Sequence, residues 1–515
     1  MFNKKVIAVA IAAATTIGTI AQVNAMELNE KGIGQALIGP VYYAEGAYNT
    51  DIVVVNTRTD SAVKAKVVLR SHKDSVEVLD FIIYLSPADV WRGTVRGTGT
   101  TGEAELYSDD DSMRTGDDAN GAGGNSASTA APIVQALNTA STGNLYSDGD
   151  TNDWGHVDVL GVYAIPNGAY AVPTSVKTGG SVTVKRTMSK DDLAILFAEI
   201  DNNQAANRNQ DYNDCTVAAL TANTGFARVS SISPCALEIT GDVTIGVPGQ
   251  HRASYTMHAM NAGNPDFVTM ADNLLGATTE AGASVAQQQA IDAMLVVANP
   301  TYNELRTANS HLAYSWGLDD STGLSTNRSN LQQYDKAIAR TLTSWTYDPE
   351  ADGTTNAVVT FPTKYLHRDN TNDSSSTSSA INFYNEPCGT NTLTTAQSAA
   401  NGTEYYSRPF RANGNVERTV VTYDNMENTS TTPEGDFSGG AVGTTGVFID
   451  EVNYANHASI GYFSTAGGWG HIRYTNEAGT CSQTRFGTAV AYNSFPALSL
   501  VYKIGTGEPG RGFEK

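Results

Sequence analysis

Hydrophobic and polar residues alternate in short runs in the N-terminal part of the chain. The run Thr50–Asn56 holds four consecutive apolar residues, the polar segment Thr57–Ser61 follows, and Ala62–Arg70 carries an apolar residue at every second position. A third run, Val76–Leu85, is rich in Val, Ile, Phe and Tyr and stops at Ser86-Pro87. These patterns predict antiparallel strands, and the first two runs are expected to form a hairpin.

Similar runs, separated by loops dense in Asp, Asn, Gly, Ser and Thr, continue along the chain. Further strands are predicted at Val157–Ile165, Ser181–Lys185, Asn356–Phe361, Val416–Tyr423, Val447–Val452, Gly487–Tyr492 and Leu498–Ile504. The longest polar loops are Ser108–Thr129, Ser141–Asp153 and Asn370–Ser379. The pattern predicts a mainly β protein, built from antiparallel β-sandwich units of immunoglobulin-like type with a few short helices and long polar loops.

Three segments have helical features instead. Ser189 followed by Asp192 resembles a capping arrangement ahead of the apolar run Leu193–Ala198. The segments Ser284–Ala298 and Asn330–Leu342 are also predicted to be helical, the latter with one apolar face. Each helix is expected to bury its apolar stripe against a sheet.

The first 25 residues have the composition of a secretory signal peptide. Lys4 and Lys5 precede an uncharged, mostly apolar run, Val6–Ile20, and small residues at Val23 and Ala25 suit cleavage after Ala25. The apolar run is shorter than the roughly 20 residues that span a bilayer, which argues against a retained anchor. No transmembrane segment is expected in the mature chain, and the protein is expected to be exported to the cell surface or the medium rather than to stay in the periplasm.

Length and charge narrow the alternatives. A chain of 515 residues predicts more than one packed unit, here an N-terminal β-sandwich domain with acidic loop insertions over 26–250 and a C-terminal β-rich domain with helices over 251–515. The formal net charge is -21. Nucleic-acid binding needs clustered cations to neutralise phosphates, so a nucleic-acid partner is not expected. The acidity fits solubility or calcium binding.

Four cysteines are present, namely Cys215, Cys235, Cys388 and Cys481. An even number in an exported chain favours disulfides over metal binding or catalysis. Three pairings are possible, and proximity in the sequence favours Cys215 with Cys235 and Cys388 with Cys481. No C-x-x-C motif supports a redox role.

A short internal repeat suggests a calcium site. Leu106-Tyr107-Ser108-Asp109-Asp110-Asp111 recurs as Leu145-Tyr146-Ser147-Asp148-Gly149-Asp150, followed by Thr151-Asn152. The candidate ligands are Asp148, Asp150 and Asn152, with Asp109 and Asp111 in the first copy, because oxygen ligands two residues apart on a turn suit Ca²⁺. No closing glutamate stands where an EF-hand has one, so a solvated acidic loop is the competing interpretation.

Other chemistry has weaker signals. Neither H-E-x-x-H nor G-x-S-x-G occurs, so zinc-protease and α/β-hydrolase functions lack support and no catalytic residue is assigned. A catalytic carboxylate pair stays open, since its spacing depends on the fold. Trp154, Trp469, Tyr405 and Tyr406 are candidate sugar-stacking residues, although core packing is the more frequent use of such side chains.

Several phrases along the chain resemble a family of poorly characterised proteobacterial secreted cell-surface proteins. They are Glu77-Val78-Leu79-Asp80-Phe81, Tyr84-Leu85-Ser86-Pro87-Ala88-Asp89-Val90-Trp91, Gly155-His156-Val157-Asp158-Val159-Leu160-Gly161 and Val358-Val359-Thr360-Phe361-Pro362-Thr363-Lys364. The resemblance implies export and a surface location, and it carries no catalytic residues with it. Taken by themselves, the prolines in these phrases mark strand ends.

These observations favour a non-enzymatic structural or adhesive protein of the cell surface, part of an envelope layer or fibre, with self-association or other envelope components as its partners. Edge strands offer a route to such assembly. The alternative is a secreted carbohydrate-binding protein or glycan-active enzyme.

Overall fold

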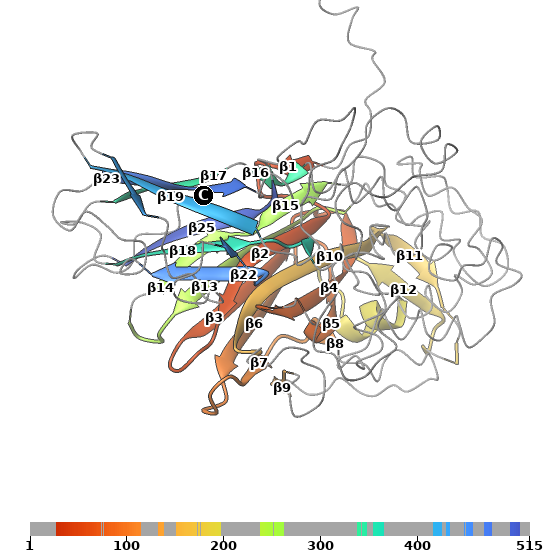
Figure 1. The fold of residues 1–515 in the computed structure, drawn as a ribbon. Coiled ribbons are helices and arrows are strands. Elements are labelled where there is room, and N and C mark those ends of the chain that lie inside the picture. The colour runs from red at the N-terminus through yellow and green to blue at the C-terminus, as the bar shows by residue number, and fades with distance from the viewer. Residues whose placement is uncertain are drawn as a thin grey trace, which may run out of the picture.

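The protein is mainly β. The structure is a computed structural model that describes residues 27–73, 75, 77–114, 132–137, 151–172, 174–175, 177–196, 237–250, 252–261, 337–340, 342–347, 354–364, 416–424, 429–432, 447–448, 450–456, 468–475 and 495–504. Its strands form several sheets in which the pairs are antiparallel (Figure 1). The predicted mainly β, antiparallel class is therefore confirmed.

Two sheets form the N-terminal part of the molecule. The first has seven strands, in the order β1 (Glu27–Asn29), β15 (His258–Asn261), β2 (Ala36–Tyr43), β10 (Trp154–Pro166), β4 (Ser61–Ser71), β5 (Glu77–Leu85) and β8 (Met113–Arg114). The second has six, in the order β14 (Arg252–Thr256), β13 (Ile239–Gly246), β3 (Asn49–Asn56), β6 (Val90–Gly97), β7 (Ala104–Ser108) and β9 (Ile133–Ala136). Strands β14 and β15 lie beyond residue 250 and still belong to these sheets.

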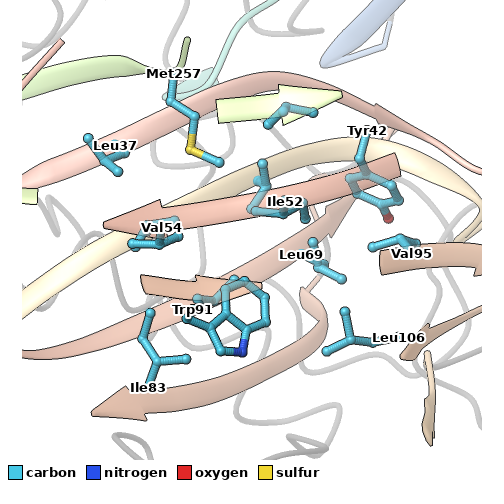
Figure 2. Close-up of a cluster of buried hydrophobic side chains, with 14 of the residues drawn as sticks. Leu37, Tyr42, Ile52, Val54, Leu69, Ile83, Trp91, Val95, Leu106 and Met257 are labelled. Carbon is cyan, nitrogen blue, oxygen red and sulfur yellow. The ribbon is translucent and has the colours of Figure 1, made fainter. Parts of the chain in front are cut away.

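Side chains of both sheets meet in one hydrophobic cluster (Figure 2). The rings of Phe81 from the first sheet and Trp91 from the second lie 5.2 Å apart, and Trp91 is fully buried. Gly93, two residues after Trp91, makes room for the indole, because a Cβ at Gly93 would lie 2.6 Å from the ring. Burial of such large apolar side chains is the main source of stability for this part of the fold.

The expected hairpin between the runs 50–56 and 62–70 is wrong, because β3 and β4 lie in different sheets. β3 pairs with β13 and β6, whereas β4 pairs with β10 and β5. The link crosses between the sheets and is held by Asn56, whose amide donates to the carbonyls of Ser61 (2.8 Å) and Ser86 (3.0 Å). A short polar link between two apolar runs fits either connection, so the pattern alone does not encode the pairing.

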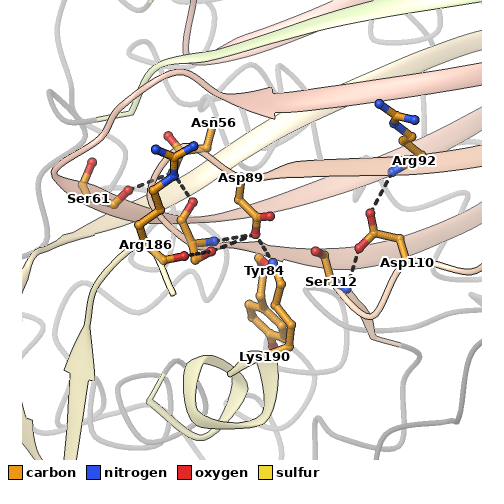
Figure 3. Close-up of polar contacts among 10 residues, drawn as sticks. Asn56, Ser61, Tyr84, Asp89, Arg92, Asp110, Ser112, Arg186 and Lys190 are labelled. Carbon is orange, nitrogen blue, oxygen red and sulfur yellow. Dashed lines mark hydrogen bonds and ion pairs between the residues drawn. The ribbon is translucent and has the colours of Figure 1, made fainter. Parts of the chain in front are cut away.

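The segment Ser86–Asp89 forms the turn that its proline predicts (Figure 3). One carboxylate oxygen of Asp89 accepts hydrogen bonds from the Ser86 backbone N–H (2.8 Å) and hydroxyl (3.1 Å). The same carboxylate forms an ion pair with Lys190, and the Asn56 N–H donates to the Asp89 carbonyl (2.9 Å). This turn therefore connects the sheet-to-sheet link with the helix that follows.

A helix at residues 190–196 begins where the capping pattern predicts. The Ser189 hydroxyl accepts from the Asp192 N–H (3.1 Å), which is the N-cap interaction. The helix and the hairpin of β11 (Gly168–Ala171) and β12 (Ser181–Val184) cover part of the outer face of the seven-stranded sheet. The buried side chains there are Ala62, Ile82, Tyr84, Ile165, Tyr170, Val172, Val182, Val184, Met188, Leu193 and Leu196.

The C-terminal half contributes three further sheets. One holds β17 (Leu342–Tyr347), β23 (Gly468–Thr475), β19 (Val416–Asp424) and β20 (Thr429–Thr432), with β21 (Val447–Phe448) also paired to β19. A second has the order β22 (Val452–Asn456), β18 (Thr354–Thr360) and β25 (Leu498–Ile504), and the third pairs β16 (Ala339–Arg340) with β24 (Phe495–Pro496).

The three-stranded sheet is a layer between two cores. Val358 of β18 belongs to the N-terminal cluster, whereas its neighbours Ala357 and Val359 belong to a second cluster with residues of β19 and β23. The Thr360 hydroxyl also donates to the Pro40 carbonyl of β2 (2.6 Å). The two halves of the chain therefore share buried surface through this sheet.

The helix predicted at Asn330–Leu342 is wrong at its C-terminal end, where residues 339–340 and 342 lie in β16 and β17. Its other residues up to 336, the predicted helix Ser284–Ala298 and the predicted strand Gly487–Tyr492 lie outside the described residues. Within the described ranges, no helix is long and apolar enough to cross a membrane.

Candidate functional site

The outer face of the seven-stranded sheet, which points away from the shared core, buries charged side chains. Lys64, Lys66 and Arg70 of β4 are at most 1% exposed. The register places Arg70 opposite His156 of β10, and Asp158 follows two residues later. Because directly opposed residues share a face, cations, a histidine and a carboxylate lie on one side of two neighbouring strands.

Arg70 and Asp158 form an ion pair on this face. Arg70 Nε donates to Asp158 Oδ2 over 2.8 Å, and a second N–H of the guanidinium donates to the Ser75 carbonyl (3.1 Å). Burial raises the pKa of Asp158, and the charge of Arg70 opposes that shift. The pair links β4 to β10 and compensates two charges that would otherwise be costly to bury.

His156 lies beside the ion pair as a neutral imidazole. Its Nε2 is 3.8 Å from Asp158 Oδ2, too far for a hydrogen bond, and within the described part of the chain neither ring nitrogen has a hydrogen-bond partner. Burial and the nearby charge of Arg70 lower the pKa of His156 well below its usual value. The arrangement is therefore not a hydrogen-bonded His–Asp dyad of the kind that transfers protons.

Glycines let the backbones approach closely around this face. A Cβ at Gly155 would lie 1.7 Å from the Arg70 carbonyl oxygen, and one at Gly161 would lie 2.3 Å from the Leu237 side chain. The register of β10 shifts at both positions. The phrase from Gly155 to Gly161, one of those that carry the family resemblance, thus describes a strand buried on both faces.

His72, the first residue after β4, contacts both Trp154 and a segment of the C-terminal half. Its ring stacks on Trp154 with centroids 3.9 Å apart, and its carbonyl accepts hydrogen bonds from the N–H groups of Glu451 (3.1 Å) and Val452 (2.8 Å). Burial and the charge of Lys73 lower the pKa of His72 to about 3. Trp154, a candidate for sugar stacking, therefore acts as a packing residue.

The candidate calcium ligands fall into three groups. Asp148 and Asp150 lie outside the described residues, and Asp109 and Asp111 are exposed. Asn152 is buried, and its amide accepts from the Ala104 N–H (2.7 Å) and donates to the Leu137 carbonyl (3.2 Å). The structure thus uses Asn152 to anchor its loop to β7.

Among the residues that the structure describes, no group of three or more His, Cys, Asp and Glu side chains is placed to hold a metal ion. Cys215, Cys235, Cys388 and Cys481, together with Tyr405 and Tyr406, lie outside the described ranges. Calcium binding and the disulfides remain predictions.

Trp469 of β23 is the one exposed member of the aromatic set within the described residues. Its side chain is 42% exposed, and its ring lies 5.7 Å from that of His471 at an interplanar angle of 30°. Both residues are on the face of the five-stranded sheet opposite to Ile472 and Tyr474, which are buried in the second cluster. Within the described residues, Trp469 is therefore the candidate sugar-stacking residue whose side chain stays exposed.

The buried ionic face was not predicted from the sequence. Alternation along β4 correctly assigns Val63, Ala65, Val67 and Leu69 to the core, and it suggests that the intervening Lys64 and Lys66 face solvent. The available signal was His156 and Asp158 inside an otherwise apolar strand, because a polar pair in such a run needs a buried partner.

Comparison of the chain with models of protein families, with curated proteins and with solved structures finds no match in any of the three.

Proposed function

We propose that the protein is an exported, non-enzymatic component of the cell surface with a structural or adhesive role. The observation that carries this proposal is the complete burial of Arg70, His156 and Asp158, each at most 1% exposed. Groups without access to solvent cannot meet a substrate, so their role is to hold strands together. Recognition is then left to exposed faces and sheet edges.

Two edges support assembly with other molecules. Among the described strands, β14 pairs only with β13, and β17 pairs only with β23. Edge strands present backbone N–H and C=O groups that can pair with another chain. Leu342 at the start of β17 is 37% exposed, which adds apolar surface to that edge.

We also infer that the two N-terminal sheets form an immunoglobulin-like sandwich. The support is the single cluster to which both sheets contribute and the repeated crossing of the chain between them, from β2 to β3, β3 to β4 and β5 to β6. Sandwiches of this type are common scaffolds for surface recognition.

Electron microscopy of cells and of the purified mature protein, with and without calcium, tests the assembly role. We expect ordered arrays or filaments on the cell and in the purified sample. A strictly monomeric, evenly dispersed protein would overturn the proposal. Intact-mass measurement of material recovered from the cell surface tests export, because the exported chain should be cleaved after Ala25. Non-reducing peptide mapping of the same material should show two disulfides.

A glycan-active enzyme is the alternative that most needs to be tested against this proposal. A panel of glycoside substrates incubated with the mature protein separates the two classes. Robust turnover that one carboxylate substitution abolishes would favour the enzyme, whereas the surface role predicts no turnover.

A further inference from the structure

The turn that contains Asp89 and the start of the helix at 190–196 bring a lysine against a carboxylate (Figure 3). Lys190 Nζ forms an ion pair with Asp89 Oδ2 and donates another hydrogen bond to the Tyr84 carbonyl (3.3 Å). The side chains of Lys190 and Asp89 are only 12% and 20% exposed. An amine and a carboxyl group that lie 101 positions apart in the sequence are therefore held together where water has little access.

Burial makes the charged form of this pair costly. It lowers the pKa of Lys190 to about 8, because an ammonium group loses solvation inside the protein. Transfer of the ammonium proton to Asp89 removes both charges and leaves a neutral amine beside a neutral carboxylic acid. The neutral amine is the nucleophilic form of a lysine, and the neutral acid is the form of a carboxyl group that an amine attacks.

Ser86 holds the carboxyl group of Asp89 in a fixed orientation. Asp89 Oδ2 accepts hydrogen bonds from the Ser86 backbone N–H (2.8 Å) and hydroxyl (3.1 Å). Two donors directed at one oxygen stabilise the negative charge that develops on a carbonyl oxygen during acyl transfer. Neither of these bonds involves Oδ1 of Asp89, which is therefore the oxygen placed to leave.

We propose that Lys190 and Asp89 join in an intramolecular amide bond, an isopeptide link between the two side chains. Lys190 Nζ bonds to Cγ of Asp89, the Cγ–Oδ1 bond breaks, and Oδ1 leaves as water with the two protons that the nitrogen loses. The step needs no oxidant and no further reactant. It assigns a modification site within the fold, and it does not depend on the proposed surface role.

The bond would tie the crossing between the two N-terminal sheets to the helix. Asp89 lies between β5 and β6, which belong to different sheets, and Lys190 begins the helix that covers part of the seven-stranded sheet. A covalent link that closes a loop of about 100 residues restricts the unfolded chain, as a long-range disulfide does. The link should therefore stabilise this part of the fold, and it should resist reducing agents.

A second lysine–aspartate pair in the same region provides a comparison. Lys177 and Asp192 also form an ion pair, but their side chains are 24% and 32% exposed. Water reaches this pair more readily and solvates its charges, so we expect it to remain an ordinary ion pair.

Mass spectrometry of the full mature protein, after denaturation and reduction, tests the proposal. The intact mass should be lower than the mass of the mature sequence by one water. Tryptic digestion should yield a branched peptide that joins the segments containing Asp89 and Lys190. Lys190→Arg keeps the cation but supplies no nucleophilic amine, so this variant should have the full mass of its sequence and a lower urea midpoint than the parent. Lys177→Arg is the matched control and should keep the branched peptide.

An intact mass equal to that of the mature sequence, with the two segments recovered as separate peptides, would overturn the proposal and leave a buried ion pair. Loss of the branched peptide in Lys177→Arg would also contradict it, because the bond would then not depend on the buried pair. The parent protein decides the main question, so the result does not require the variants to fold. Failure of the surface role is a separate result, because it appears as loss of surface location in the parent whatever its mass.

Discussion

Two outer faces of this molecule can be compared directly, that of β4 with β10 and that of β23 with β17. In each case the opposite face of the same strands lies on a hydrophobic cluster. The first face carries Arg70 and Asp158 and is fully buried, whereas the second carries Trp469 at 42% exposure. The charged side chains of β4 and β10 are thus buried on a face that alternation assigns to solvent. The Trp469 ring of β23 is exposed, although such rings more often pack in a core.

The difference shows that a strand pattern identifies two faces without saying what covers each of them. On β4 and β10 part of the cover comes from a segment distant in the sequence, the helix at 190–196, which packs with Ala62 and Ile165. Removing a side chain from the buried face should therefore cost stability, whereas removing the exposed Trp469 side chain should change stability little.

The largest effect is expected for Gly155→Ala. The new Cβ would lie 1.7 Å from the Arg70 carbonyl oxygen, so the β4 and β10 backbones must separate. We expect destabilisation beyond the roughly 1–3 kcal/mol typical of overpacking. Urea denaturation measures this. Gly168→Ala is the control, because its Cβ would meet only Tyr170 at an ordinary 3.5 Å, and equal effects in the two variants would contradict the close approach.

The next effect is expected for Asp158→Ala, which leaves Arg70 buried without its counter-charge. Breaking one side of a buried pair costs about 3–5 kcal/mol. The double variant Arg70→Met with Asp158→Leu should recover much of that loss, because it removes both charges. Asp60→Ala, which breaks the exposed pair with Arg58, should change the free energy of unfolding by only about 0–1 kcal/mol.

Acidification should destabilise the protein through the buried face. The pKa of His72 is about 3 in the folded state against an ordinary 6.5, so the unfolded chain takes up the proton first. The contribution of His72 to stability is complete above pH 6.5 and declines as the pH falls from 6.5 towards 3, by up to a few kcal/mol at about 1.4 kcal/mol per pKa unit.

Urea midpoints measured between pH 7 and pH 4 check this dependence. His72→Phe keeps an aromatic ring against Trp154 and should flatten the curve. His471→Phe should flatten the curve less than His72→Phe does, because burial and the charge of Arg473 also lower the pKa of His471. The same slope in the parent and in His72→Phe would show that other groups control the acid sensitivity.

The smallest effect on stability is expected for Trp469→Ala. An exposed side chain away from the cores changes the free energy of unfolding by about 0.5 kcal/mol or less. Trp91→Ala, by contrast, removes a fully buried indole and should cost about 3–5 kcal/mol. Thermal unfolding of both variants measures the contrast, and a large loss in Trp469→Ala would mean that the face of β23 that carries Trp469 is a packed interface.

Several features were predictable from local sequence. The strand β25 has the predicted bounds, Leu498–Ile504, and the N-cap at Ser189 and the turn at Ser86–Asp89 lie where the sequence places them. Such features depend on neighbouring residues, through side-chain alternation, a capping hydroxyl or a proline. The candidate calcium ligands Asp148 and Asp150 and the four cysteines lie outside the described residues, so calcium binding and the disulfides stay predictions.

The wrong assignments have a common physical cause. The short polar segment between Asn56 and Ser61 predicts a hairpin after β3, yet the partners of β3 are residues 90–97 and 239–246. In the same way, Leu342 fits an amphipathic helix by spacing, but pairs in a strand with Arg473. Pairing with strands distant in the sequence overrides local periodicity, because the sheet supplies hydrogen bonds that the local pattern does not predict.

Local sequence specifies the β class, the strands that bury one apolar face and the local turns and caps, because these follow from alternation and backbone preference. Long-range packing specifies which strands pair, that Arg70 and Asp158 meet in the interior and that Trp469 stays at the surface. Burial depends on which distant segments cover a face, and the neighbouring residues in the sequence do not specify those segments.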